Sequence, residues 1–462
     1  MKHSGKSATA SLGTEKISTL LFRYALPSII AMTAASLYNI IDSIFIGHGV
    51  GPLALSGLGI TMPLMNVAAA FGSLVGVGAA AQLSIKLGQG DRESALRIVG
   101  NTVTLNVIIG LVFGGICLLF LEPIMRAFGA SEATLPYATG YMRIILMGNI
   151  VTHLYLGLNN TLRAAGHPNL SMVAMIASVV GNCVLAAIFI MGFGWGVEGA
   201  AWATVIAQVI ALAIQLRFFS DKRNEIHFVR SAFRLQKKIV NGIISIGLAP
   251  FLMNLTASAV VVFINNALRT SGGESGDLYI GAYGIVNRVA LIFIMVVFGL
   301  NQGMQPIVGY NFGAKNHDRV RKALSLALKW AVGITTVGLL IGLFFPQTVA
   351  RVFTTDPTLL AVTEEGLRIV MLVFPIVGFQ IVISSFFQSI GNAKTAIILS
   401  LTRQLLFLIP LLVILPPIFG SKGVWFAMPS ADMVSGILAF ILISRFFSKF
   451  KRENTTLPDT QK

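Results

Sequence analysis

One acidic side chain lies deep within the first long apolar run of the chain, at Asp42. An ionised carboxylate inside hydrocarbon costs at least about 2.5 kcal/mol, so such a residue is expected to face a polar cavity and to bind a proton or another cation. Asp42 follows Tyr38 and Asn39 at helical spacing, which places three polar groups on one helix face. These residues form the first candidate ion site, although an aspartate satisfied by neighbouring helices would show the same pattern.

A second acid, Asp432, lies within the last apolar run and has no polar companions at helical spacing. We expect it to make a structural hydrogen bond to a neighbouring helix. Two cations, Arg288 and Arg403, also fall inside apolar runs, where each needs a partner or must reach the membrane surface. Gating, structural pairing and substrate contact are all open for these two arginines.

Further candidates for a substrate cavity or for gating lie in matching parts of the two halves of the chain. Pro27 and Pro250 free backbone carbonyls and allow their helices to bend. Asn254 and Asn265 are polar groups in a run that contains no acid. Met295 has a flexible thioether that suits a pocket for varied apolar compounds, and ordinary helix packing explains it equally well.

Motifs for enzymatic chemistry are missing from the sequence. Gly5-Lys6-Ser7 lacks the first glycine and the preceding strand that a phosphate-binding loop requires. No HExxH motif, nucleophile elbow or paired-carboxylate site is present. Cys117 and Cys183 lie in apolar runs with no nearby Cys/His cluster, which indicates neither zinc nor a disulfide framework. We therefore expect a protein that is not an enzyme and that has no cofactor or bound metal.

The composition requires a membrane. Of the 462 residues, 55% are hydrophobic and 11% are charged, whereas soluble domains have about 25% charged residues. The apolar runs are continuous, without the alternation of barrel strands, and each can cross about 30 Å of hydrocarbon as a helix. Twelve transmembrane helices are predicted, near residues 20–46, 53–81, 98–121, 135–157, 168–191, 197–219, 240–268, 278–304, 322–345, 361–387, 394–417 and 423–447.

The net charge of +16 is explained by membrane orientation. With both termini in the cytoplasm, 25 of the 34 Lys and Arg residues fall on the cytoplasmic side and four in outer loops. This distribution predicts a multi-pass protein of the plasma membrane, the inner membrane in bacteria. Because the charges are spread between apolar runs, nucleic-acid binding is not expected, while contact with anionic lipid is.

The two halves of the chain are an internal repeat with an offset of about 224 residues. Matching pairs include Gly78 with Gly303 and Gly88 with Gly313. Six helices in each half make both halves enter from the same side, so an axis along the membrane normal relates them. We predict an all-α membrane protein with two parallel six-helix lobes around a central cavity. The expected parts are an N-terminal lobe (1–219), a cytoplasmic basic linker (220–239), a C-terminal lobe (240–447) and a cytoplasmic tail (448–462).

The sequence resembles the multidrug and toxic compound extrusion (MATE) family of cation-coupled efflux antiporters over nearly its whole length. The resemblance is carried by Tyr38-Asn39-Ile40-Ile41-Asp42, the repeated Gly88-Gln89-Gly90-Asp91 and Gly313-Ala314-Lys315-Asn316 turns, Gln305-Pro306-Ile307-Val308-Gly309-Tyr310-Asn311 and Gly196-Val197-Glu198-Gly199. The sequence is most similar to the bacterial drug-efflux branch that includes the Mep-type pumps. The resemblance implies that Asp42 carries the coupling ion and that the first helix bends at Pro27.

Two further positions match the coupling site of prokaryotic MATE relatives, and one departs from it. Asn182 on the fifth helix and Thr204 on the sixth match, whereas Ala186 stands where relatives have a second acid. A single carboxylate exchanges at most one proton, or holds Na⁺ with fewer charged ligands. We therefore expect ion coupling through Asp42, Asn182 and Thr204, with H⁺ as the coupling ion and Na⁺ as the alternative.

These observations together predict a secondary active exporter of hydrophobic cations, functional as a monomer, that gives resistance to drugs or other xenobiotics. The proposed exchange is with H⁺, by alternating access of one cavity to the two sides of the membrane. The alternatives are a Na⁺-coupled version of the same exporter and a lipid-linked saccharide flippase, which shares the two-lobe design. Such flippases often carry several cations in a groove, whereas the spans here contain few.

Overall fold

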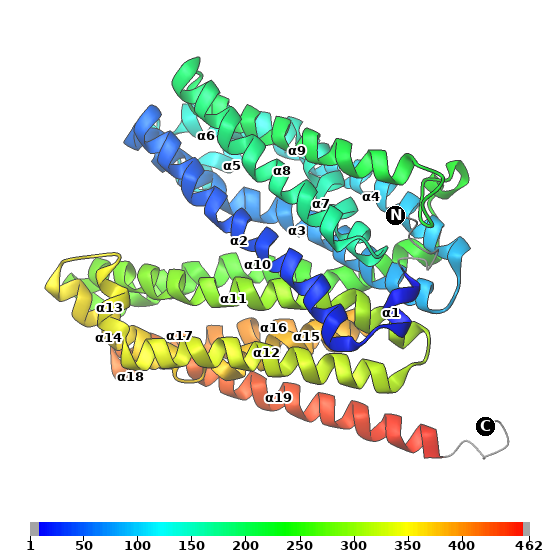
Figure 1. The fold of residues 1–462 in the computed structure, drawn as a ribbon. Helices are drawn as coiled ribbons and strands as arrows, with labels where there is room; N and C mark the ends of the chain where they lie inside the picture. The colour runs from blue at the N-terminus through cyan, green and yellow to red at the C-terminus, as the bar shows by residue number, and fades with distance from the viewer. Residues whose placement is uncertain (1–8, 456–462) are drawn as a thin grey trace. The chain divides into compact units, whose positions relative to one another are not determined.

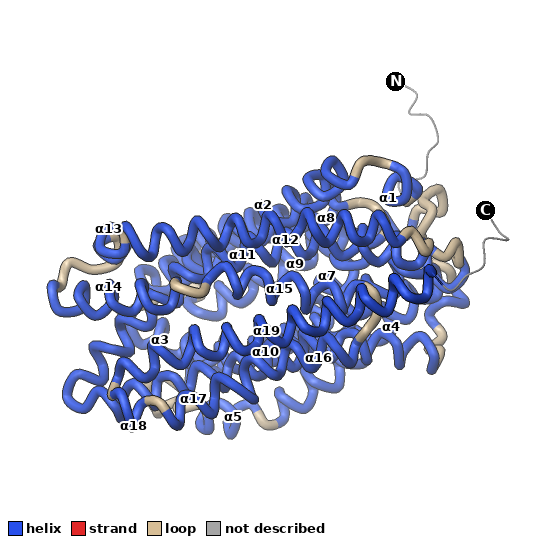
Figure 2. Tube along the Cα trace, turned by 90° about the horizontal axis from the view of Figure 1, so that it is seen from below, coloured by secondary structure: helices blue, strands red, loops and turns tan. Residues whose placement is uncertain are grey.

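The computed structural model describes residues 9–455, which form helices joined by turns and loops, with no strand in this range (Figure 2). The predicted all-helical class is therefore confirmed. The first half of the chain contains α1 (Ala10–Thr14), α2 (Ile17–Gly49), α3 (Pro52–Gly88), α4 (Arg92–Leu119), α5 (Leu121–Ala127), α6 (Leu135–Met147), α7 (Asn149–Ala164), α8 (Pro168–Ala186), the π-helix η1 (Ala187–Gly192) and α9 (Gly196–Ser220).

The second half follows a short 3₁₀ segment in the linker and repeats the same pattern (Figure 1). Its elements are η2 (Arg230–Phe233), α10 (Lys237–Gly272), η3 (Gly273–Ser275), α11 (Gly276–Gly313), α12 (His317–Phe344), α13 (Pro346–Arg351), α14 (Pro357–Met371), α15 (Phe374–Ser389), α16 (Ala393–Leu401), the π-helix η4 (Thr402–Leu408), α17 (Ile409–Ile414), α18 (Pro416–Phe419) and α19 (Ser421–Thr455).

Each predicted span coincides with a helix or a broken helix. Nine stretches of the described residues are long and apolar enough to cross a membrane, and one of these, Lys237–Gly313, contains both α10 and α11. α14 and α15 make a further crossing together, with a bend of 51° between them. α6 and α7 are interrupted at Gly148 and cover the predicted span 135–157. Twelve crossings follow, as the sequence predicts.

Local sequence signals explain where several helices begin. Pro52, Pro168 and Pro357 occupy the first helical turn, where a missing backbone N–H costs nothing. Asp91 caps α4 by accepting a hydrogen bond from the backbone N–H of Ser94 at 3.1 Å. The preceding Gly90 has a φ of +72°, which permits the tight turn between α3 and α4.

The chain divides into two compact units that differ from a simple division at the linker. Unit 1 comprises residues 1–258, 298–327 and 388–393, and unit 2 comprises residues 259–297, 328–387 and 394–462. Within unit 1, α8 packs on α9 and on α2, and α7 packs on α3 and α4. Within unit 2, α19 packs on α14 and η4. One apolar core of unit 1 lies among α2, α3, α6, α8 and α9, and another lies around α3, α4, α7 and α9.

The linker between α9 and α10 is held firmly on α4. The buried side chain of Asn101 donates to the carbonyl of Ala232 at 2.9 Å and accepts from the backbone N–H of Gln236 at 2.9 Å. Thr104 adds a hydrogen bond to the carbonyl of Phe233 at 2.8 Å. The linker is therefore an ordered part of unit 1.

Candidate functional site

Asp42 lies in α2 and is buried, with 6% of its surface exposed. Its Oδ1 atom has no hydrogen-bond partner among the described residues. Tyr38 and Asn39 lie on the same helix, but their side chains are outside the described residues. The structure therefore places the acid in the interior of unit 1, within the helix that packs against α8.

Asn182 and Thr204 are brought together from neighbouring helices. The Asn182 Nδ2 atom donates to Thr204 Oγ1 at 2.9 Å, and Thr204 Oγ1 in turn donates to the carbonyl of Ala200 at 3.0 Å. Both residues are buried, at 3% and 8% exposure. This short relay joins α8 to α9.

Ala186 lies one turn after Asn182, is fully buried, and belongs to an apolar core of unit 1. It is the last residue of α8 before the π-helical segment η1. The position that would supply a second acid is thus filled by a methyl group. Asp42 is the buried acid that the described part of unit 1 offers on α2, α8 and α9.

The proposed cavity and gating residues are distributed over the two units. Pro27 is buried within α2, which continues through it as a helix, and Pro250 is half-buried in α10. The carbonyl of Pro250 accepts from Asn254 Nδ2 at 3.0 Å, and Asn254 is otherwise exposed. These residues belong to unit 1, whereas Asn265 and Met295 are half-buried residues of unit 2.

The second intramembrane acid has a cationic partner. Arg403 Nε donates to Asp432 Oδ1 at 2.6 Å, joining η4 to α19 within unit 2. The expected interhelical hydrogen bond of Asp432 is therefore present, and Arg403 supplies it. Arg288, in contrast, is exposed on α11, with no ion pair in the described part of the chain.

One buried cation of unit 1 is not apparent from the sequence pattern. Arg163, at the end of α7, was expected on the solvent-facing cytoplasmic side but is only 5% exposed. It donates to Asn160 Oδ1 at 2.5 Å and to Ser171 Oγ at 3.3 Å, and it has no acidic partner among the described residues. The signal that could have identified it is the polar run Asn159-Asn160-Thr161 immediately before it.

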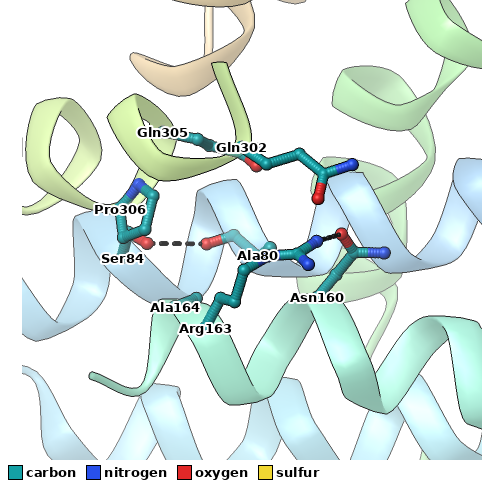
Figure 3. A pocket seen from close by; sticks show the side chains of 8 residues that line it. All are labelled: Ala80, Ser84, Asn160, Arg163, Ala164, Gln302, Gln305 and Pro306. Carbon is teal, nitrogen blue, oxygen red and sulfur yellow. Dashed lines mark hydrogen bonds between the residues drawn. The ribbon is translucent and has the colours of Figure 1, made fainter. Parts of the chain in front are cut away.

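Arg163 lines a narrow polar pocket within unit 1. Figure 3 shows Arg163 and Asn160 on one side and Gln302 on the other, with their polar ends directed into the pocket. The Gln302 Oε1 atom is buried and has no hydrogen-bond partner. The remaining lining residues are Ala80, Ser84, Ala164, Gln305 and Pro306.

Comparison with known proteins identifies relatives over almost the entire chain. The sequence profile of the MatE family matches residues 27–188 and 254–414. The chain is 26% identical to the multidrug export protein MepA of Staphylococcus haemolyticus, over 96% of each chain. It is also 26% identical to MepA of Staphylococcus aureus strain MRSA252, over 92% of each chain.

Solved structures show the same arrangement of helices. A crystal structure described as MATE in the bent conformation matches with a TM-score of 0.91 and 25% identity, covering 98% of this chain and all of the other. The multidrug transporter DinF-BH, in complex with rhodamine 6G, matches with a TM-score of 0.87 and 36% identity, covering 96% of this chain and 98% of that one.

Proposed function

The chain belongs to the MatE family and is a multidrug efflux transporter, and from this premise we propose that it exports hydrophobic cations in exchange for H⁺ by alternating access. The observation that carries the proposal is the buried Asp42 carboxyl group, whose Oδ1 atom lacks a hydrogen-bond partner. A buried, unpaired carboxylate is costly while it is charged, and a bound proton removes that charge.

The neighbouring polar groups support a role for Asn182 and Thr204 in the same lobe. Their hydrogen bond fixes the orientation of both side chains between α8 and α9. With Ala186 replacing a second acid, the only carboxylate of the proposed site is Asp42. We therefore expect at most one proton to be exchanged in each cycle.

In the proposed cycle, the cavity binds substrate from the cytoplasm, opens outward, and releases substrate when Asp42 takes up a proton. H⁺ and substrate drive the change because each binds one conformation better than the other. The moving bodies would be the lobes 1–219 and 240–447, with the segment 220–239 as their linker. We place both termini in the cytoplasm of a bacterial inner membrane and expect a monomer in contact with membrane lipid.

Aromatic cations are the proposed substrates. The relatives named multidrug export protein MepA and the DinF-BH complex with rhodamine 6G support export of varied organic compounds. A single acid in an otherwise apolar helix bundle favours cations over anions, because a buried anion would lack a compensating charge near Asp42.

The test uses energised inside-out membrane vesicles with an acidic interior. Ethidium added to wild-type vesicles should dissipate the pH gradient, because export into the vesicle releases H⁺. Asp42→Asn should lose at least about 90% of this dissipation, since an amide does not bind a proton at neutral pH. Asp42→Glu, which retains an acid, should recover part of it.

Replacing Na⁺ in the buffer separates the proposed antiport from the Na⁺-coupled alternative. Dissipation that is unchanged without Na⁺ supports H⁺ exchange. If Asp42→Asn dissipated the gradient as well as wild type, the role of Asp42 would be wrong. If ethidium, rhodamine 6G and related cations caused no dissipation with or without Na⁺, cation antiport would be contradicted and the lipid-linked saccharide flippase favoured.

A further inference from the structure

Two glycines allow the backbones of the two sequence halves to touch at one end of unit 1. Gly88 at the end of α3 lies against the carbonyl oxygen of Tyr310 in α11, and a Cβ atom at Gly88 would overlap that oxygen. Gly313 at the end of α11 lies in the same way against the carbonyl oxygen of Ile85 in α3. The two contacts are reciprocal, because Gly88 and Gly313 match in the internal repeat.

A second matched pair continues this contact along the same helices. Gly78 in α3 lies against the carbonyl oxygen of Ile243 in α10, and a Cβ at Gly303 in α11 would lie 2.5 Å from the backbone nitrogen of Ala25 in α2. Backbone contacts this close, of the Cα–H···O type, recur between packed helices. We call Gly78, Gly88, Gly303 and Gly313 together the glycine seam.

The polar pocket of Arg163 lies beside the glycine seam and opposes its closure. Gln302, immediately before Gly303, leaves its Oε1 atom buried without a partner, and the Arg163 guanidinium is buried with only neutral partners described. Buried charges and unpaired amides are stabilised when water reaches them. Separation of the helices at the seam would therefore hydrate groups that closure strips of water.

We propose that the glycine seam is a gate at the end of the molecule that the sequence places in the cytoplasm. Closure requires the missing Cβ atoms at these four positions, and the buried polar groups of Arg163 and Gln302 keep the closed state from becoming permanent. This inference rests on the proposed alternating access. It adds which residues allow the closed state and which residues oppose it.

The gate is tested by distance measurements between spin labels, without substrate or ion gradient. Labels attached at Gln89 and Asn316, both exposed beside the seam, report its separation in a Cys117→Ala/Cys183→Ala background. Gly88→Ala combined with Gly313→Ala should lower the population with the short distance about tenfold, because overpacking at a backbone contact disfavours closure. Gln302→Leu should act in the opposite direction and enrich the short distance.

Gly59→Ala is the matched control, because Gly59 lies in α3 and a Cβ there meets nothing within 4 Å. It should leave the distances unchanged. Unchanged distances in the folded double alanine variant would overturn the proposal, as would a longer distance in Gln302→Leu. Because no transport is measured, a failure of the proposed H⁺ exchange would leave this result intact, and the reverse also holds.

Discussion

At the residue scale, the ion pair of Arg403 and Asp432 shows how a charge is tolerated in the interior of unit 2. The pair joins η4 to α19, and the Asp432 side chain is 9% exposed. Removing one partner of a buried pair leaves an uncompensated charge, which is usually more costly than the pair itself is stabilising.

We expect Asp432→Asn alone to destabilise the folded protein by about 3 kcal/mol, because Arg403 is then left without its counter-charge. Arg403→Gln alone should have a similar effect. The double variant should recover most of this loss, because two neutral amides can hydrogen-bond to each other. Thermal unfolding of the purified protein in detergent checks this, and a double variant less stable than both single variants would contradict a structural role for the pair.

Residue-scale prediction from sequence succeeds where a side chain is unusual for its surroundings. Asp42 and Asp432 stand out because acids are rare in apolar runs. The pairing of Asp432 with Arg403 is not readable, since the two residues lie 29 positions apart on different helices. The burial of Arg163 is missed because a cation at a helix end is normally solvated, and only the packing of neighbouring helices covers it.

At the element scale, the turn between α3 and α4 depends on a charged helix cap. Asp91 accepts hydrogen bonds from Ser94 and from Lys86, and these lower the pKa of Asp91 to about 2. Since the unfolded value is near 3.9, the stabilisation is complete above about pH 4 and is lost as the pH falls toward 2. The matching position in the second half is Asn316, which is also a favoured cap residue.

Asp91→Ala should therefore destabilise the protein by about 1 kcal/mol at neutral pH, because the backbone N–H of Ser94 loses its acceptor. Asp91→Asn should retain most of the stability at neutral pH, since asparagine also caps helices, but should show a weaker loss of stability between pH 4 and pH 2. Thermal unfolding at stepped pH values measures both effects. An acid dependence equal to that of wild type in Asp91→Asn would show that other carboxyl groups dominate.

Helix positions follow from the sequence, whereas interruptions within helices do not. Runs of apolar residues and the glycine and proline turns locate each crossing. The π-helical segments η1 and η4, the break at Gly148 and the 51° bend between α14 and α15 leave the hydropathy of their runs unchanged. They arise from packing between helices, which a single run of sequence does not encode.

At the scale of the whole molecule, the internal repeat predicts two similar sets of six helices, and the helices are present as expected. The grouping into units 1 and 2 was not predicted. Residues 298–327 and 388–393 of the second half belong to unit 1. This grouping reflects close contacts such as those of the glycine seam, which depend on the conformation adopted and not only on the fold.

The central claim is that substrate and proton compete through Asp42, and proton release from the purified protein tests it most directly. Ethidium is added to the protein in weakly buffered detergent solution, and the pH change is recorded during binding. Wild type should release up to one proton for each ethidium bound, and Asp42→Asn should release none. Equal release by the two proteins, or substrate binding by wild type without any proton release, would contradict the proposed exchange.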